Sequence, residues 1–260
     1  MSRNLLVVTV TLISLGSLVS CTPRETIPET GRSRPTLNYS EEEMAVLGAE
    51  LYEESLEGTS IITGTPDAEM VQRVGAKLAA VSGKDYDWEF RLVAAPLEKN
   101  AFCLPGGKVA VYSGILPIAG SEDGLAVVLG HEMAHATLQH GNERLSQPAL
   151  KQLIGLPLKL GADLWGALAP RSRRLVAGVF GVGKVVGEFL PYDQDHEFEA
   201  DEVGLSMMRR AGYDIRDAPR FWQRMMDAAP NRQKGDALST HPEPEKRIER
   251  LNRLVALIEQ

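Results

Sequence analysis

The sequence predicts an α+β domain that is mostly helical, with a small sheet beside its most distinctive helix. Helix-capping residues followed by apolar periodicity recur along much of the chain from residue 40 onward. Three short stretches, at 88–94, 101–104 and 108–112, instead have the apolar patterns of strands. In a chain of 260 residues, 43% of them hydrophobic, residues 39–260 are long enough for a substantial core, and we predict a single domain there.

The composition excludes two classes of protein. The formal net charge is −7 and no basic face is present, which argues against a nucleic-acid partner. Cys21 and Cys103 are the only cysteines, too few for a disulfide framework. Stability is therefore expected to come from the core and from any bound metal.

Residues 1–20 have the features of a secretory signal peptide, with a positive start, a short apolar run and small residues at the end. Its end, Leu18 to Cys21, resembles the bacterial lipobox, in which the cysteine is lipidated and becomes the first residue of the mature protein. Thr22 rather than aspartate follows, which by the same resemblance favours an anchor in the outer membrane on the periplasmic side. A plain N-terminal anchor, or cleavage elsewhere, is the alternative. Residues 21–38 have little to bury and predict a tether.

The central stretch is His131-Glu132-Met133-Ala134-His135, a His-Glu-x-x-His pattern. On a helix the two histidines lie about 40° apart on one face, so both imidazoles can bind one metal ion. Glu132 is turned about 100° away and is placed to take a proton from water as a general base. The alternative is a pair of ordinary histidines on a half-buried helix. Ser121 is predicted to cap this helix and Gly141 to end it.

Two structural helices are predicted before the sheet. The first begins with a capping box of Ser40 and Glu43 and runs to about Leu56. The second covers Pro66 to Val81. In the sheet, the turn at 105–107 joins the last two strands into a hairpin, one strand of which can be an edge that holds an extended peptide by backbone hydrogen bonds. An ordinary core hairpin is the alternative.

Residues 145–190 are apolar and glycine-rich, but charged residues interrupt them too often for a membrane-spanning helix. The pattern predicts two helices, at about 149–168 and 172–189, joined at Pro170. They can cover the cleft, lie shallowly in a lipid surface or pack in the core. Further helices are predicted up to Arg210, and then at 218–228 and 242–258.

A second cluster of candidate ligands follows at Glu197 to Asp201. A hydrolytic zinc ion needs three protein ligands and one open position, and the two histidines supply only two. Glu197 and Asp201 are four residues apart on a predicted helix, so one can bind the metal while the other supports the site. Glu199 lies on the opposite face and is the weaker candidate. An acidic, solvated helix start is the alternative.

With both halves in view, the chain resembles the zinc metallopeptidases of the CAAX prenyl protease and HtpX type, most closely their small periplasmic lipoprotein branch. Four motifs carry the resemblance, at Asn100 to Gly107, His131 to His135, Glu197 to Asp201 and Ser239 to Pro242. The resemblance implies a zincin-like domain with one Zn²⁺ per chain that hydrolyses peptide bonds.

The resemblance also implies individual roles. Glu197 would be the third zinc ligand, and Asp201 would hydrogen-bond a ligand histidine. His241 would lie near the oxyanion formed during attack, with Arg247 in the same region. The predicted substrate-binding residues are Asn100, Ala101, Phe102 and Cys103.

The chain departs from the family pattern at two places. Asp193-Gln194 stands where the family often has Ser-Arg, and Cys103 stands where a small residue such as alanine is usual. We interpret Cys103 as a buried small side chain rather than a regulatory ligand. His140 and His196 are interpreted as solvated or packing residues.

Together these features predict a membrane-anchored zinc endopeptidase. Unfolded or unassembled envelope proteins are its expected substrates, by analogy alone. The competing hypothesis is a chaperone or assembly factor that keeps its zinc site closed and holds clients at the hairpin edge. A purely structural lipoprotein with a vestigial site is the third interpretation.

Overall fold

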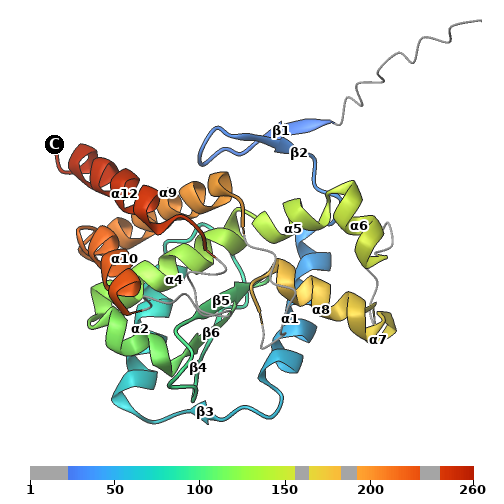
Figure 1. Cartoon of the computed structure of the whole chain (residues 1–260), viewed down its shortest axis with the longest axis horizontal. Helices are drawn as coiled ribbons and strands as arrows, with labels where there is room; N and C mark the ends of the chain where they lie inside the picture. The colour runs from blue at the N-terminus through green and yellow to red at the C-terminus, as the bar shows by residue number, and fades with distance from the viewer. Residues whose placement is uncertain (1–22, 156–163, 183–191, 229–240) are drawn as a thin grey trace, which may run out of the picture.

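The computed structural model describes residues 23–155, 164–182, 192–228 and 241–260 (Figure 1). The predicted signal peptide and the predicted lipidation site Cys21 lie outside these residues, as do parts of the 145–190 segment and Ser239. The described part is mostly helical with a small sheet, which confirms the predicted fold class.

The sheet has four strands in the order β3-β4-β6-β5. Strand β3 (Ile61–Ile62) is antiparallel to β4 (Glu89–Val93), β4 is parallel to β6 (Lys108–Tyr112), and β6 is antiparallel to β5 (Ala101–Leu104). The predicted β5–β6 hairpin is confirmed, and β5 forms one edge of this sheet. Strand β3 was not predicted, because a pair of isoleucines is too short for a periodic pattern.

Helices cover both faces of the sheet, and the strands alternate between them. Cys103 and Val109 belong to the core that includes α2 (Pro66–Ala79) and α4 (Glu122–Thr137). Phe102 and Ala110, the next residues on the same strands, belong to the core that includes α1 (Glu41–Leu56) and α8 (Pro170–Val179). This period of two is that of a sheet buried on both sides. Strand β5, the strand nearest to α4, therefore lies between two apolar layers.

Helix α4 lies at the centre of the molecule, and every residue from Gly124 to Thr137 is buried. Its predicted start is confirmed, because the Ser121 hydroxyl accepts a hydrogen bond from Gly124 N at 3.1 Å. Its predicted end is wrong. Helix α4 stops at Thr137, Gln139 takes a left-handed conformation with φ 59°, and α5 (His140–Leu145) begins directly afterwards.

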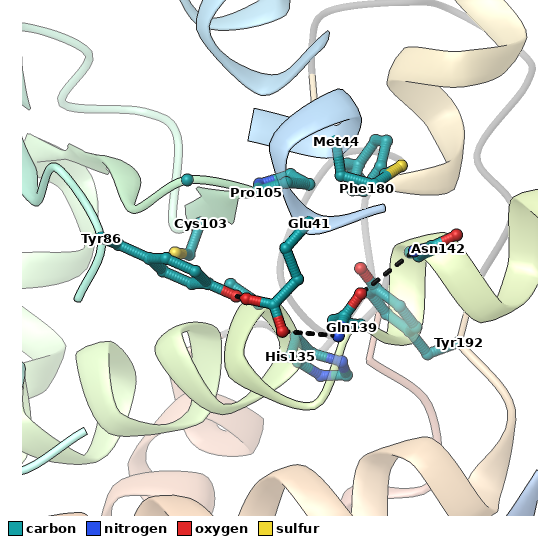
Figure 2. A pocket seen from close by; sticks show the side chains of 13 residues that line it. Glu41, Met44, Tyr86, Cys103, Pro105, His135, Gln139, Asn142, Phe180 and Tyr192 are labelled. Atoms are coloured by element: carbon teal, nitrogen blue, oxygen red, sulfur yellow. Dashed lines mark hydrogen bonds between the residues drawn. The ribbon is translucent and has the colours of Figure 1, made fainter. Parts of the chain in front are cut away.

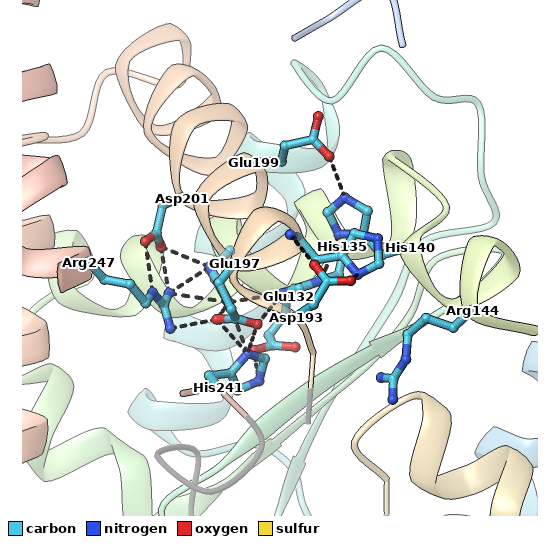
Figure 3. A network of polar contacts seen from close by, with 12 residues as sticks. Glu132, His135, His140, Arg144, Asp193, Glu197, Glu199, Asp201, His241 and Arg247 are labelled. Atoms are coloured by element: carbon cyan, nitrogen blue, oxygen red, sulfur yellow. Dashed lines mark hydrogen bonds and ion pairs between the residues drawn. The ribbon is translucent and has the colours of Figure 1, made fainter. Parts of the chain in front are cut away.

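Gly141, which was expected to end the helix, lies inside α5 instead. A Cβ at this position would be 1.9 Å from the ring of Phe180, so the glycine is needed for packing. The sharp turn at Gln139 keeps the chain close to α4. As a result His140 lies near His135 rather than in solvent (Figure 3).

Helix α9 (Gln194–Arg210) packs along α4 and is capped by Asp193, whose carboxylate accepts a hydrogen bond from His196 N at 2.9 Å. The departure from the family pattern at Asp193 therefore supplies a helix cap. Two more helices, α10 (Asp217–Ala228) and α12 (Pro244–Ile258), pack against each other, α10 also against α4 and α12 against α9.

Residues 23–38 correct the prediction of a tether. They contain an antiparallel hairpin of β1 (Arg24–Thr26) and β2 (Ser33–Pro35), which lies beside α5 and α9 in Figure 1. Ile27 is 1% exposed, and Arg34 donates a hydrogen bond to the carbonyl of Leu138. The segment looked polar because it packs through arginines, whose partners are distant in sequence.

In the described residues of the 145–190 region, α6 and α8 end earlier than the two predicted helices. Helix α6 (Pro148–Ile154) ends at Gly155, which has φ 75°, and α8 ends before Gly181, which has φ 67°. Such left-handed glycines are common helix stops. Helix α7 (Leu164–Ala167) lies between α6 and α8 in the sequence. Buried residues of α8 join the core, which favours the core interpretation for that helix.

The remaining short elements are η1 (Ser113–Ile115) and α3 (Leu116–Ala119), which lead from β6 into α4. Within the described residues, none of the helices combines the length and apolar character needed to cross a membrane.

Candidate metal centre

Four side chains from three parts of the chain converge beside α4 (Figure 3). His131 and His135 come from α4, Glu197 comes from the first turn of α9, and His241 precedes α12. Each offers one donor atom, and these atoms all lie within 4.8 Å of one another. All four residues are buried.

The spacing of the donors fits a tetrahedral ion. The Nε2 atom of His131 lies 3.1 Å from Nε2 of His135 and 3.1 Å from Nδ1 of His241. Oε2 of Glu197 lies 3.4 Å from His131 Nε2, and Oε1 of Glu197 lies 3.4 Å from His135 Nε2 and 3.0 Å from His241 Nδ1. Zinc with ligand distances of about 2.0–2.1 Å in tetrahedral geometry separates its donors by about 3.3 Å. The residues present therefore fit zinc.

The charge state of the donors also suits a cation. Burial raises the pKa of Glu197, but His241, Arg247 and His131 outweigh it and hold the pKa well below its ordinary value. Burial lowers the pKa of His135 well below its ordinary value. An ionised carboxylate and a neutral imidazole are the forms that bind zinc.

Glu132 lies at the edge of this cluster. Its carboxylate oxygen is 3.3 Å from Nε2 of His241, and the residue is buried. Burial raises its pKa, although His241 and His131 oppose the shift. A carboxylate whose pKa is raised towards neutrality is a better proton acceptor and donor than an ordinary glutamate.

Asp201 and Arg247 support His131 and Glu197 through hydrogen bonds and an ion pair. The Asp201 carboxylate accepts a hydrogen bond at 3.0 Å from Nδ1 of His131, which leaves Nε2 of that ring for the metal. Arg247 donates to both oxygens of Asp201, at 2.8 and 2.5 Å, and lies 2.7 Å from Glu197. Its guanidinium lies over the Trp222 ring, 3.6 Å from the centroid, and the residue is fully buried.

His135 is held by different residues from His131, and these contacts were not predicted from the sequence. Nδ1 of His135 lies 2.9 Å from Nδ1 of His140, and Nε2 of His140 lies 3.2 Å from Glu199 (Figure 3). Neither residue is solvated: His140 is 0% and Glu199 7% exposed. The interpretation of His140 as a packing residue thus misses a polar contact.

Tyr192 was also missed as a neighbour of the site. Its ring stacks on His135 with centroids 4.0 Å apart, and it is buried. The Arg144 guanidinium lies 4.7 Å from the centroid of the Tyr192 ring. An isolated tyrosine has no spacing pattern from which its place beside the site could have been predicted.

An acidic pair lies beyond His140. Glu143 and Glu199 both bind Arg32 of the β1–β2 hairpin. Burial favours the neutral carboxyls, but His196 and Arg32 outweigh it for Glu143, and His140, Thr30 and Arg32 do so for Glu199; each pKa falls to about 2. His196 stacks on His140 with centroids 4.3 Å apart, and its Nε2 lies 3.3 Å from Glu143, so it is buried and makes a polar contact as well as packing.

A pocket adjoins His135 on the side of α1 (Figure 2). Met44, Phe180 and Cys103 give it apolar walls. Glu41 closes its rim by contacts with Gln139 at 2.9 Å and Tyr86 at 3.2 Å. Burial raises the pKa of the Cys103 thiol well above its ordinary value, and Cys103 is not among the four grouped donors.

The predicted substrate-binding residues lie at and just before β5, and all four are buried. The Phe102 ring packs in the core against Tyr52 and Tyr112, with centroids 6.3 and 6.1 Å away. Its side chain is thus committed to the fold. A role in substrate binding remains a prediction for the backbone of this strand.

With this geometry established, comparison with known proteins identifies the family. The model of Peptidase family M48 matches residues 66–255, nearly three-quarters of the chain. The chain belongs to peptidase family M48. The matched region of this M48 domain includes His131, His135, Glu197 and His241, and it leaves out the β1–β2 hairpin and α1.

Several curated proteins are similar to the M48 chain. Mitochondrial metalloendopeptidase OMA1 of Schizosaccharomyces pombe is 39% identical over 190 residues, 72% of this chain and 52% of that protein. Metalloendopeptidase OMA1 of Danio rerio is 32% identical over 261 residues, covering 94% of this chain and 53% of its own length. The beta-barrel assembly-enhancing protease of Escherichia coli is 25% identical over 257 residues, covering 95% and 51%.

The M48 chain thus spans about half the length of these relatives. They support the zincin-like metallopeptidase expected from the motifs. They are OMA1 and beta-barrel assembly-enhancing proteins rather than CAAX prenyl proteases or HtpX, so the narrower branch stays a prediction.

Proposed function

We propose that this chain is a zinc-dependent endopeptidase. The observation that carries the proposal is the set of four buried donors within 4.8 Å of one another, with Glu132 beside them. Membership of peptidase family M48, and similarity to proteins named metalloendopeptidases, support the same activity.

The residues of the site have distinct tasks in peptide hydrolysis. Zinc held by these donors would supply a Lewis acid that polarises the peptide carbonyl and acidifies water. Glu132 takes the proton from the attacking water and delivers it to the leaving amine. Asp201 fixes the tautomer of His131, and Arg247 fixes Asp201 and Glu197 together.

His241 has a position that differs from the expected one. The sequence suggested an oxyanion role, whereas its Nδ1 lies among the donors, and a zinc ion held by all four would have no position left for water. We infer that hydrolysis requires the His241 ring to leave the donor set. Zinc affinity separates the two roles: loss of a donor weakens zinc binding in His241→Ala, whereas loss of an oxyanion contact lowers cleavage alone.

The closed donor set also favours a second candidate function. A protein that keeps its zinc site shut can hold clients without cleaving them, as a chaperone or assembly factor does. The edge position of β5 suits both functions, because an extended chain can add to the sheet there by backbone hydrogen bonds. The side chains of β5 are buried, so selectivity for substrate side chains would come from elsewhere.

The substrates and location are part of the proposal. We propose unfolded or unassembled envelope proteins as substrates, supported by similarity to a protein named for enhancing beta-barrel assembly. The lipobox-like Leu18 to Cys21 supports a lipid anchor in the outer membrane, facing the periplasm. No nucleic-acid partner is proposed, given the net charge of −7.

The test compares wild type with Glu132→Gln on casein and on a denatured outer-membrane protein. A protease loses cleavage in the variant while zinc content is unchanged, because Glu132 is not a donor. A holdase suppresses aggregation of the client equally in both proteins and cleaves it in neither. That second result would replace the endopeptidase by the chaperone.

A further inference from the structure

Hairpin β1–β2 reaches the metal centre through a continuous chain of polar contacts. Arg32 Nε donates to Glu199 at 2.5 Å, Glu199 lies 3.2 Å from His140 Nε2, and His140 Nδ1 lies 2.9 Å from His135 Nδ1. Arg32 and Glu199 are 167 residues apart in sequence. Arg32 also lies outside the region matched by the family model, which begins at residue 66.

Only one arrangement of protons in this chain is compatible with a metal at His135. Its Nε2 faces His131 and Glu197 and must be unprotonated to bind. The proton of the neutral ring is then on Nδ1, which donates to Nδ1 of His140. Since His140 accepts there, its own proton is on Nε2, which donates to Glu199. The opposite order would put a proton on Nε2 of His135, where the metal binds.

The negative charge of Glu199, at the end of these contacts furthest from the metal centre, fixes the direction of the hydrogen bonds. Glu199 can only accept hydrogen bonds as a carboxylate, and it accepts them from His140, from Arg32 Nε and from the Thr30 hydroxyl. Thr30 and Arg32 both come from the hairpin. The hairpin therefore supplies the donors that keep this buried carboxylate in place.

Arg32 has a second partner, which makes its position well determined. Its two terminal nitrogens donate to the two oxygens of Glu143, at 2.9 and 2.6 Å. The guanidinium thus bridges two buried carboxylates, one on α5 and one on α9. Without it, both buried carboxylates would lose their arginine partner, which is costly in a buried environment.

We propose that Arg32 and Glu199 are positioning residues for the metal centre, which act through His140 to hold His135 in the orientation and tautomer that bind zinc. His131 has a carboxylate, Asp201, directly behind it, whereas His135 has a carboxylate one histidine further away. The contact between Arg32 of the hairpin and Glu199 then sets the zinc affinity of the site. This inference rests on the proposed zinc endopeptidase, because it assumes that the donors bind zinc.

Arg34 provides a matched control on the same hairpin. It pairs with Glu25 at 2.8 Å and donates to the Leu138 carbonyl, so it also attaches the hairpin to the domain. Among the described residues, it makes no hydrogen bond or ion pair with Glu199, Glu143 or His140. Its loss loosens the hairpin without interrupting the chain to His135.

The test measures zinc dissociation constants of the full chain in detergent by competition with a chromophoric chelator. Glu199→Gln and Arg32→Met are expected to bind zinc about ten-fold or more weakly than wild type, and Arg34→Met within about two-fold. Arg32→Lys, which keeps one charge, should recover part of the loss. Folding of each variant is checked by circular dichroism, and Glu199→Gln, which is nearly isosteric, serves if Arg32→Met fails to fold.

A second readout follows the series of hydrogen bonds from Glu199 through His140 to His135. The Nδ1 proton of His135 should give a downfield proton signal in the zinc-loaded wild type, and this signal should move in Glu199→Gln but not in Arg34→Met. If folded Arg32→Met and Glu199→Gln bind zinc as tightly as Arg34→Met, the inference is wrong and the proposed function stands. If wild type itself binds no zinc, both are wrong.

Discussion

Gly130 of α4 and Gly204 of α9 meet backbone to backbone, one residue before the first metal donor. A Cβ at Gly204 would lie 2.9 Å from the Gly130 carbonyl carbon and 3.0 Å from His131 N. Neither atom can move without moving the helix. This contact sets the distance between the helix that carries both histidines and the helix that carries Glu197.

Gly204→Ala should therefore separate α4 and α9 and weaken the metal centre. We expect a loss of about 1–3 kcal/mol in the free energy of unfolding, together with weaker zinc binding. Denaturant unfolding and chelator competition measure the two effects. Gly166→Ala on α7 is the control, since a Cβ there meets nothing within 4 Å, and it should not lower stability. A harmless Gly204→Ala would show that the helix contact is not limiting.

Arg247 should be among the most sensitive buried residues outside the donor set. It is fully buried and bonds Asp201 and Glu197, so Arg247→Met leaves two carboxylates without their partner. We expect a loss of about 3–5 kcal/mol in the free energy of unfolding. Thermal or denaturant unfolding checks this.

Arg250, on the same helix, is the control for Arg247. It pairs with Glu202 of α9 at 2.9 Å, with its side chain 38% exposed. Arg250→Met should cost no more than about 1 kcal/mol, as exposed pairs do. Equal losses for the two arginines would mean that the buried position of Arg247 has no special importance.

The lowered pKa of Glu143 predicts part of the acid sensitivity of the fold. Burial raises its pKa, but His196 and Arg32 lower it from 4.5 to about 2. A group with a lowered pKa stabilises the fold when ionised, so its contribution is complete above about pH 4.5 and is lost as the pH falls towards 2. The gap in unfolding free energy between wild type and Glu143→Gln, at most about 3 kcal/mol at pH 7, should shrink over that window.

This pH series is best measured in chelator, so that metal loss does not contribute. Glu249→Gln is the control, since the Glu249 side chain is 70% exposed and lies 3.5 Å from Arg253. It should change the unfolding free energy little at any pH. A gap for Glu143→Gln that stayed constant down to pH 2 would contradict the assignment of its lowered pKa.

Cys103 should be unreactive in the folded protein. Its thiol is buried, and burial raises its pKa well above the ordinary value, so little thiolate is present at neutral pH. In a Cys21→Ser variant, which leaves this single thiol, a maleimide should label Cys103 only after unfolding. Rapid labelling of the native state would instead indicate an open path from solvent to the pocket beside His135.

The core of the site could be predicted because its information is local. The two histidines and Glu132 lie within one helical turn or so, the Ser121 cap fixes where that helix begins, and Glu197 and Asp201 repeat the same spacing on α9. The strands at 101–104 and 108–112 were found from their apolar alternation and the turn between them.

The support behind His135 could not be predicted, because its parts are distant in sequence. Glu199 does lie on the opposite face of α9 from Glu197, as expected, but that face binds Arg32 instead of water. His140 was assigned to the end of α4, and only the left-handed turn at Gln139 brings it back to His135. In the sequence alone, a segment whose arginines pair with distant carboxylates has the same polar composition as a solvated tether.

Zinc content tests the central claim most directly. Wild type, Glu132→Gln and Glu197→Gln are purified side by side and their bound zinc is measured by mass spectrometry. If His131, His135 and Glu197 hold the ion, wild type and Glu132→Gln contain about one zinc per chain and Glu197→Gln contains much less. Wild type without zinc, or Glu197→Gln with as much as wild type, would contradict the account.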